Sequence, residues 1–109
     1  MPDHRASIQT IHAAGTMTGA SNSSAIVVGA YQEVSLYFDT TAISAGGTLD
    51  VVIQDSPDNS EYYDYASVTQ ITATGNKAHR IGTNIGTYLR LSYTASGTWT
   101  GEIKAVLKT

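Results

Sequence analysis

The chain has 109 residues, a formal net charge of -3 and no cysteine, and its length is that of one domain. The lack of cysteine excludes a disulfide scaffold, a zinc–thiolate site and a thiol nucleophile. Charged residues make up 14% of the chain, against about 25% in ordinary globular domains. Eleven serines and 15 threonines replace them, and with 41% hydrophobic residues the chain is expected to fold rather than remain disordered.

Neither a secretory signal nor a membrane span is expected. The polar residues 1–5 are not followed by the apolar segment of a signal peptide. The longest aliphatic run, residues 25–28, is far shorter than the roughly 20 residues of a membrane helix. We therefore expect a soluble protein made in a cytoplasm. Six basic residues in an acidic chain also make a poor match for nucleic acid.

The first half of the chain predicts strands of unequal strength. Residues 6–12 and 24–28 are weak strand candidates, separated by a loop at 15–24 that is rich in Gly, Ala, Ser and Thr. Residues 33–39 alternate strictly between apolar and polar side chains, which predicts a half-buried strand with Val34, Leu36 and Phe38 inward. Residues 42–47 are expected to form a loop, with room for one helical turn.

The second half predicts two hairpins. Strands at 49–54 and 61–66 flank the turn sequence Ser-Pro-Asp-Asn-Ser at 56–60, so residues 48–66 are expected to form a β-hairpin, with 68–72 as a short continuation. A short strand is expected near 78–81, between turns at 75–76 and 82–86. Residues 87–108 then alternate in two runs around Ala-Ser-Gly at 95–97, which predicts a second hairpin with Trp99 and Tyr93 inward.

These elements indicate an all-β protein. Seven to nine short strands at roughly even spacing are typical of a sandwich, a jelly roll or a small barrel, and we expect an antiparallel β-sandwich, jelly-roll-like in form. We expect a single sandwich domain over residues 6–109, preceded by a flexible N-terminal arm at residues 1–5.

The charges are segregated along the chain. No Lys or Arg occurs between residues 6 and 76, where there are seven acids, while residues 77–109 hold five bases and one acid. If strands from the two blocks interleave, the charges mix on the surface. Otherwise an acidic and a basic face could meet across subunits of an assembly.

No arrangement of residues predicts catalysis or a cofactor. The three histidines, His4, His12 and His79, have no metal-ligand spacing, and a Gly-x-Ser-x-Gly elbow and a P-loop are both absent. The acids between 55 and 64 could offer oxygen ligands to calcium, but they do not match an EF-hand loop. Asp58 and Asn59 also suit a tight turn that uses its own side chains, and this is the preferred interpretation. We expect no enzymatic activity, no metal and no cofactor.

Tyrosines crowd residues 62–65. Because neighbouring side chains in a strand point to opposite faces, Tyr62, Tyr63 and Tyr65 cannot all face inward. An exposed strand tyrosine can be incidental, can stack on a sugar or can anchor a protein interface.

Two stretches resemble small all-β virion proteins of tailed bacteriophages, most of all capsid decoration (cement) proteins. They are residues 48–65 (TLDVVIQDSPDNSEYYDY) with 68–72 (VTQIT), and residues 88–107 (YLRLSYTASGTWTGEIKAVL). The sequence departs from that pattern where Asn59 replaces a turn glycine and where tyrosines replace a tryptophan. Asn tolerates the left-handed backbone, so we expect the turn to survive.

The resemblance implies a structural protein on the capsid surface of a virion, with neck or tail positions as further options. Its partners would be the major capsid protein and other copies of the same chain, as a homotrimer. Residues that could contact the capsid or another subunit are the arm and three surface side chains: Pro2, Asp3, His4, Arg5, Tyr63, Arg80 and Arg90. The arginines could face acids such as Asp55 or Glu61 of a neighbour.

Ser-Pro-Asp turns also occur in carbohydrate-binding sandwiches. The alternative function is therefore a carbohydrate-binding β-sandwich module, whose platform would use Tyr62, Tyr63, Tyr65 and Trp99.

Overall fold

The computed structural model describes residues 6–81 and 86–108, which form one antiparallel sheet of seven strands. The all-β prediction is confirmed, and the described residues contain no helix, so none that could span a membrane. The strands are β1 (Ala6–Asn22), β2 (Ile26–Val27), β3 (Glu33–Ile43), β4 (Thr48–Ser56), β5 (Tyr63–Ser67), β6 (Gly75–Ile81) and β7 (Tyr88–Lys108).

Strand β7 is the centre of the sheet. Along one edge it pairs with β1 and then β2; along the other it pairs with β3 through residues 99–108 and with β4 through residues 88–96. Consecutive strands β3 and β4 thus lie end to end on the same neighbour. Strands β5 and β6 repeat this arrangement one position further out, on β4 and β3.

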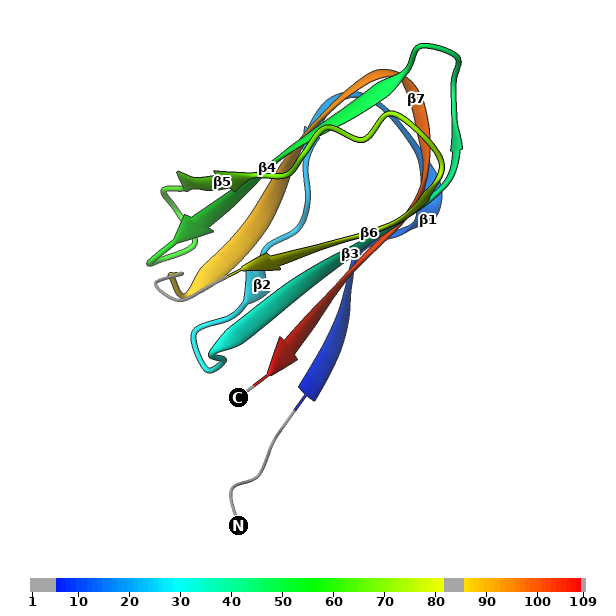
Figure 1. The fold of residues 1–109 in the computed structure, drawn as a ribbon. Coiled ribbons are helices and arrows are strands. Elements are labelled where there is room, and N and C mark those ends of the chain that lie inside the picture. Colours follow the sequence, from blue (N-terminus) through cyan, green and yellow to red (C-terminus); the bar gives the residue numbers. More distant parts are fainter. Residues whose placement is uncertain (1–5, 82–85, 109) are drawn as a thin grey trace.

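The sheet consequently folds over on itself. Four long segments, β1–β2, β7, β3–β4 and β5–β6, bend at the same end of the molecule, away from the start of β1 and the end of β7 (Figure 1). We call the part containing β3, β6, residues 6–18 and residues 98–108 the β3 half. The part containing β2, β4, β5, residues 19–22 and residues 88–96 is the β4 half. A single curled sheet stands where two separate sheets were expected, and a jelly-roll topology is not confirmed.

The bend in β7 corrects the predicted hairpin at 87–108. Residues 88–108 form one strand of 21 residues that bends at Gly97, with a φ of 76°, but does not reverse. Its neighbour β1 steps from Thr18 opposite Thr98 to Gly19 opposite Ala95, so β7 carries two extra residues at the fold. Gly19, Gly46 and Gly75 also have positive φ, which gives each long segment one such glycine near its bend.

Ser44 ties this corner together. Its backbone N–H donates to the Thr98 carbonyl and its hydroxyl accepts the Thr98 N–H, both at 3.0 Å. The Gly97 backbone packs so closely here that an added Cβ would overlap Ser44 Oγ. Gly97 is therefore required both by its left-handed backbone and by the lack of space.

The concave face of the folded sheet is the core. Inward residues alternate along β3, β4 and β7 as the sequence predicts, and the alternation keeps its phase across the bend. The core includes Val34, Leu36, Phe38, Leu49, Val51, Ile53, Leu89, Leu91, Tyr93, Trp99, Ile103, Ala105 and Leu107, each at most 3% exposed.

Trp99 joins the two halves near the bend. Its indole is fully buried, and Nε1 donates a 2.9 Å hydrogen bond to Oγ1 of Thr40, which is 3% exposed. A Cβ on Gly101 would overlap the Asp39 carbonyl and press on the Trp99 ring. The small residue thus lets the ring lie against the strand pair β3–β7.

Several boundaries differ from the prediction. The expected loop at 15–24 lies mostly within β1, because pairing with β7 extends the strand through Gly, Ala and Thr residues of low hydrophobicity. The turn expected at 75–76 is the start of β6.

The loop expected at 42–47 is shorter than predicted. Residues 42–43 belong to β3, and residues 44–47 form a turn closed by a 2.8 Å hydrogen bond from Gly47 N–H to the Ser44 carbonyl. The β4–β5 hairpin is confirmed, whereas the continuation at 68–72 is reduced to one bridge between Leu49 and Ile71.

The substitution Gly97→Ala is expected to lower the free energy of unfolding by about 1–3 kcal/mol, since it places a Cβ in a left-handed conformation and against Ser44. Denaturant unfolding measures this. Gly15→Ala is the matched control, because a Cβ there meets its nearest neighbour, the Ala13 carbonyl, at an ordinary 3.6 Å. Equal stability of the two variants would contradict the importance of the bend.

Thr40→Val is expected to cost about 1–3 kcal/mol of unfolding free energy, because it leaves the buried Trp99 N–H without an acceptor while keeping the side-chain volume. Thr40→Ser retains the hydroxyl and should recover most of the loss. Thermal or denaturant unfolding followed by Trp99 fluorescence, from the single tryptophan of the chain, reports the difference. If valine and serine were equally stable, the hydrogen bond would not be important.

Candidate functional site

The acidic segment after β4 is a self-bonded turn. Ser56, fully buried, accepts hydrogen bonds from the N–H groups of Asp58 (3.3 Å) and Asn59 (2.9 Å) and donates its hydroxyl to Asp58 Oδ1 (3.1 Å). The same Asp58 oxygen accepts the N–H groups of Ser60 (2.9 Å) and Glu61 (3.2 Å). Asn59 takes the expected left-handed φ of 62°. The turn interpretation is confirmed.

These bonds act on the charge of Asp58. Hydrogen bonds from the backbone N–H of Ser60, and then of Glu61, stabilise the ionised form and lower the pKa of the carboxyl below its usual value. The charged carboxylate is thus part of the turn, since four backbone N–H groups donate either to it or to the Ser56 hydroxyl.

The other acids of this region are also used within the chain. Asp55 Oδ2 accepts the Gly86 N–H at 2.8 Å, Asp64 Oδ1 accepts Gln54 Nε2 at 2.9 Å, and Glu61 Oε2 accepts the Tyr63 hydroxyl at 3.1 Å. Within residues 6–81 and 86–108, no group of three or more His, Cys, Asp or Glu is placed to hold a metal ion. The acidic segment therefore shapes the β4–β5 connection.

The histidines lie on separate strands. His12, in β1, places its ring 5.7 Å from Trp99 and 6.3 Å from Tyr93 between centroids, and its Nε2 is 3.5 Å from the Gly15 carbonyl. His79 is on β6, at the other edge of the sheet. His4 lies outside the described residues. The two described rings thus share no site.

Tyr93 is buried without using its hydroxyl fully. It is 3% exposed, and its OH has no hydrogen-bond partner of normal geometry among the described residues. Burial raises the pKa of Tyr93, and the nearby Ser23 hydroxyl opposes that change only in part. The group stays neutral and belongs to the core.

The structure does not assemble the proposed sugar platform. Trp99 is fully buried, and Tyr65 is half-buried against the core. The Tyr62 ring is covered by the Arg90 guanidinium, 4.0 Å from the ring centroid. Tyr63, at 56% exposure, is the member of this set that lies well out in solvent.

Arg90 is held within its own chain. From β7 its Nε donates to Gln54 Oε1 at 2.8 Å while its guanidinium lies over Tyr62, and Gln54 in turn donates to Asp64. This half-buried network links β7, β4 and β5. The predicted contact of Arg90 with a neighbouring subunit stays a prediction, and Nε of its guanidinium is already used within the chain.

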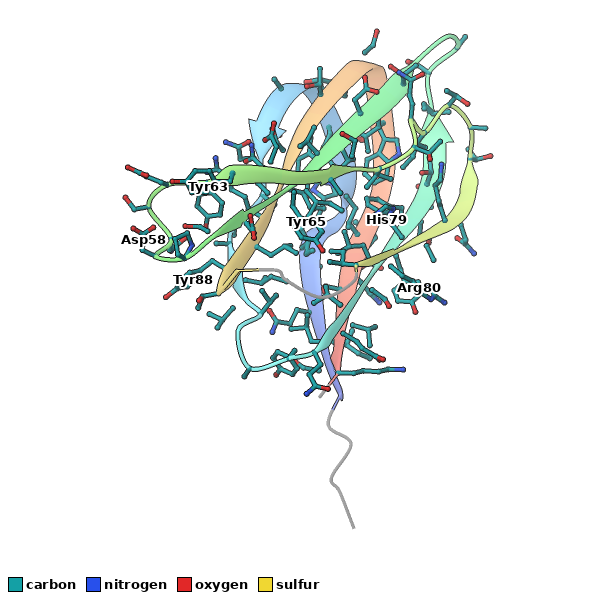
Figure 2. All side chains as sticks on the ribbon, turned by 60° about the vertical axis from the view of Figure 1, so that its left-hand side comes forward. Asp58, Tyr63, Tyr65, His79, Arg80 and Tyr88 are labelled. Atoms are coloured by element: carbon teal, nitrogen blue, oxygen red, sulfur yellow. The ribbon has the colours of Figure 1, made fainter. Side chains whose placement is uncertain are left out.

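Tyr63 and Arg80 are presented to solvent but lie far apart. Tyr63 is on β5, beside the Asp58 turn, whereas Arg80 is on β6 at the opposite side of the view in Figure 2. Arg80 is exposed and lies 5.9 Å from the centroid of the Tyr37 ring. The remaining contact candidates, Pro2, Asp3, His4 and Arg5, lie outside the described residues.

The fold separates charge between the two halves. The β4 half and its turn hold five carboxylates and one base, while four bases and three acids lie on the β3 half. In the described part of the chain the one ion pair joins Lys104 Nζ to Glu102 Oε1 at 3.4 Å, within β7. The charges of the two sequence blocks therefore mix on the β3 half but leave the β4 half acidic.

Two surface hollows of about 430 and 440 Å³ lie beside Tyr37 on the β3 half. Both are open to solvent. Lys104, with its partner Glu102, borders one of them, and Arg80 borders the other. Their polar linings come from outward side chains of β3, β6 and β7.

The open edges of the sheet were not predicted from the sequence. Strand β1 hydrogen-bonds to β7 and β6 hydrogen-bonds to β3, and among the described residues neither has a strand on its other side. On β1 the aliphatic side chain of Ile8 is 71% exposed. The clue was present in the sequence, since residues 6–22 contain no Asp, Glu, Lys or Arg.

Comparisons with known proteins give a likeness of fold to solved structures. No protein-family model and no curated protein sequence matches the chain. Among solved structures, the crystal structure of the SPBc2 prophage-derived protein YomS is similar over 100% of this chain and 97% of that one, with a TM-score of 0.68 and 13% identity. The two chains therefore share a fold from end to end.

Acid is expected to weaken the Asp58 turn. Because the pKa of Asp58 is lower in the folded than in the unfolded state, ionised Asp58 stabilises the folded protein. This stabilisation is present above the unfolded-state pKa and is lost as pH falls through the folded-state pKa. Asp58→Asn keeps an acceptor oxygen but does not titrate, so its stability should fall less than that of the parent between about pH 6 and about pH 2. Denaturant unfolding at both pH values tests this, with the exposed Asp50→Asn as the control. Identical acid sensitivity of the parent and Asp58→Asn would contradict the prediction.

Proposed function

We propose that the protein is a non-enzymatic structural component of a phage particle. In its specific form, the protein is a decoration protein that binds the major capsid protein on the outside of the head and stabilises the shell, as a homotrimer. It would be synthesised in the host cytoplasm and end on the virion surface.

The end-to-end likeness of fold to a prophage-derived protein carries this proposal. It agrees with the resemblance of residues 48–65, 68–72 and 88–107 to small virion proteins of tailed phages. Fold alone does not define function, so the argument also depends on what the surface can do.

The surface favours binding over catalysis. The carboxylates of Asp55 and Asp64 and the Nε of Arg90 are engaged in hydrogen bonds within the chain. By contrast, Tyr63, Ile8 and Arg80 project into solvent. Exposed aromatic, aliphatic and arginine side chains of this kind are the usual anchors of protein interfaces.

The described bases do not favour nucleic acid as the partner. They are spread over both halves, and acids accompany them on the β3 half, whereas a phosphate backbone attracts a continuous basic surface. A protein shell is the better fit. The carbohydrate alternative is weakened because Trp99 and Tyr62 are covered.

Binding to phage heads tests the proposal. Purified protein added to expanded heads that lack it is expected to co-sediment with them and to raise the temperature of shell disassembly, because a ligand of the intact shell stabilises it by mass action. Heads of an unrelated phage are the control. Binding to tails alone would reject the decoration role and keep a particle role, and binding to neither would reject both.

A further inference from the structure

We propose that β1 of one copy pairs, strand to strand, with β6 of a second copy, so that the chains join head to tail through the edges of their β3 halves. This inference rests on the self-association in the proposed function and names the surfaces that would make it. The second copy would add to the existing sheet by backbone hydrogen bonds, as in other cases of β-augmentation.

Strand direction permits this joint. Across the β3 half the order is β1, β7, β3, β6, and every neighbouring pair is antiparallel. One row of the ladder runs through Thr10, Lys104, Tyr37 and Ala78. With four strands in alternation, β1 and β6 run in opposite directions. The β6 strand of another copy can therefore extend the sheet beyond β1 without breaking the antiparallel pattern.

Residues 6–10 of β1 lack the usual protection of an edge strand against pairing, since the register shifts of β1 all follow Thr10. Natural edge strands carry charged residues, above all Lys, or Pro, because unpaired backbone groups attract other strands. None of the 17 residues of β1 is Asp, Glu, Lys, Arg or Pro. Residues 6–10 pair in regular register with residues 104–108 of β7, and Ile8 within this segment is 71% exposed. A strand of this kind is expected to be covered in the working assembly.

Charge decides which edge covers it. Pairing β6 with a second β6 would bring Lys77 and Arg80 of both copies onto one short ladder, and like charges facing each other destabilise a strand pair. Strand β1 contains no Lys or Arg that would repel these two side chains. His79, the other titratable group of β6, likewise meets no ionisable partner on residues 6–10 of β1.

Symmetry gives a second reason for β1 to pair with β6 rather than with a second β1. Pairing β1 with a second β1 makes a closed dimer and leaves both β6 edges open. Pairing β1 with β6 uses both edges of every copy. A head-to-tail contact of this kind forms a ring where its rotation closes and an open filament where it does not, and a three-fold rotation gives the proposed trimer. The arrangement accounts for both open edges of the β3 half with one interface.

Disulfide trapping tests the joint directly, because the chain has no cysteine of its own. Single cysteines replace Ile8 or Thr10 in one tagged chain and Ala78 or Arg80 in another; in each pair the residues lie two apart on one face of their strand. Within one chain β1 and β6 are three strand spacings apart, about 14 Å, beyond the ~7 Å reach of a disulfide. A disulfide between the two tagged chains therefore reports contact between copies.

Mixed disulfides between a β1 cysteine and a β6 cysteine are expected in at least one of the four combinations. Predominant linkage of Thr10→Cys or Ile8→Cys chains to themselves would overturn the proposal in favour of the symmetric dimer. No linkage above that seen with Ser92→Cys, on β7 of the other half, would also overturn it.

A charge on the β1 edge is expected to separate the copies. Ile8→Lys should weaken self-association at least about tenfold in light scattering. The matched control Val27→Lys changes another exposed aliphatic residue (53%), on β2 in the other half, and should associate like the parent. A parent chain that stays monomeric, or equal effects of the two variants, would overturn the joint.

Head binding, measured in parallel, separates the two proposals. A parent trimer that binds no phage particle would reject the proposed function and keep the β1–β6 joint. A monomer that binds heads would reject the joint and the homotrimer but keep the decoration role.

Discussion

The bend of β7 is the constraint on which the structure depends. One continuous strand runs through the middle of both halves, and it is paired along both edges for most of its length. The relative placement of the halves is therefore set by the backbone at residues 96–98 rather than by a flexible connection. Where β7 bends, its neighbours must bend as well, which accounts for a positive-φ glycine in each of the other long segments. A single sheet thus supplies both layers around one core.

The core depends on this bend because the same face of β7 lines the concave side of the sheet both before and after it. Tyr93 and Ala95 before the fold and Trp99 and Ile103 after it all face inward, so one strand contributes to both walls. Trp99 lies next to the fold, where its ring fills the angle and its N–H reaches Thr40 on β3. The hydrogen bond matters because a buried indole N–H without an acceptor is costly. At the bend, the Trp99 ring is therefore buried and its N–H is hydrogen-bonded at the same time.

Features that depend on residues close together in the sequence, namely strand alternation and the turn after β4, were predicted correctly. Alternation located β3, β4 and the inward side of β7, and the Ser56–Asn59 side chains predicted a turn that the hydrogen bonds confirm. At residues 95–97 the same patterns failed, because a left-handed glycine suits a reversal and a bend equally well. The difference lies in the long partners on both sides of β7, which are far away in sequence. Likewise, Met17 is the one buried residue among residues 7–22, so β1 shows little alternation. Its open edge is a property of strand order.

A folded sheet of four long segments must leave two of them with a neighbour on one side only. Here these are β1–β2 and β5–β6, and the protein treats them differently. Strands β5 and β6 carry Asp64, Lys77 and Arg80, whereas β1 has no charge at all. Since charge on an edge strand deters pairing, the two edges of the sheet differ: β1 carries no charge that opposes pairing, whereas β5 and β6 do. Meanwhile the polar groups beside β4 are bonded within the chain. Among the described residues, the strand edges without a neighbour therefore lie at the rims of the sheet and differ in charge.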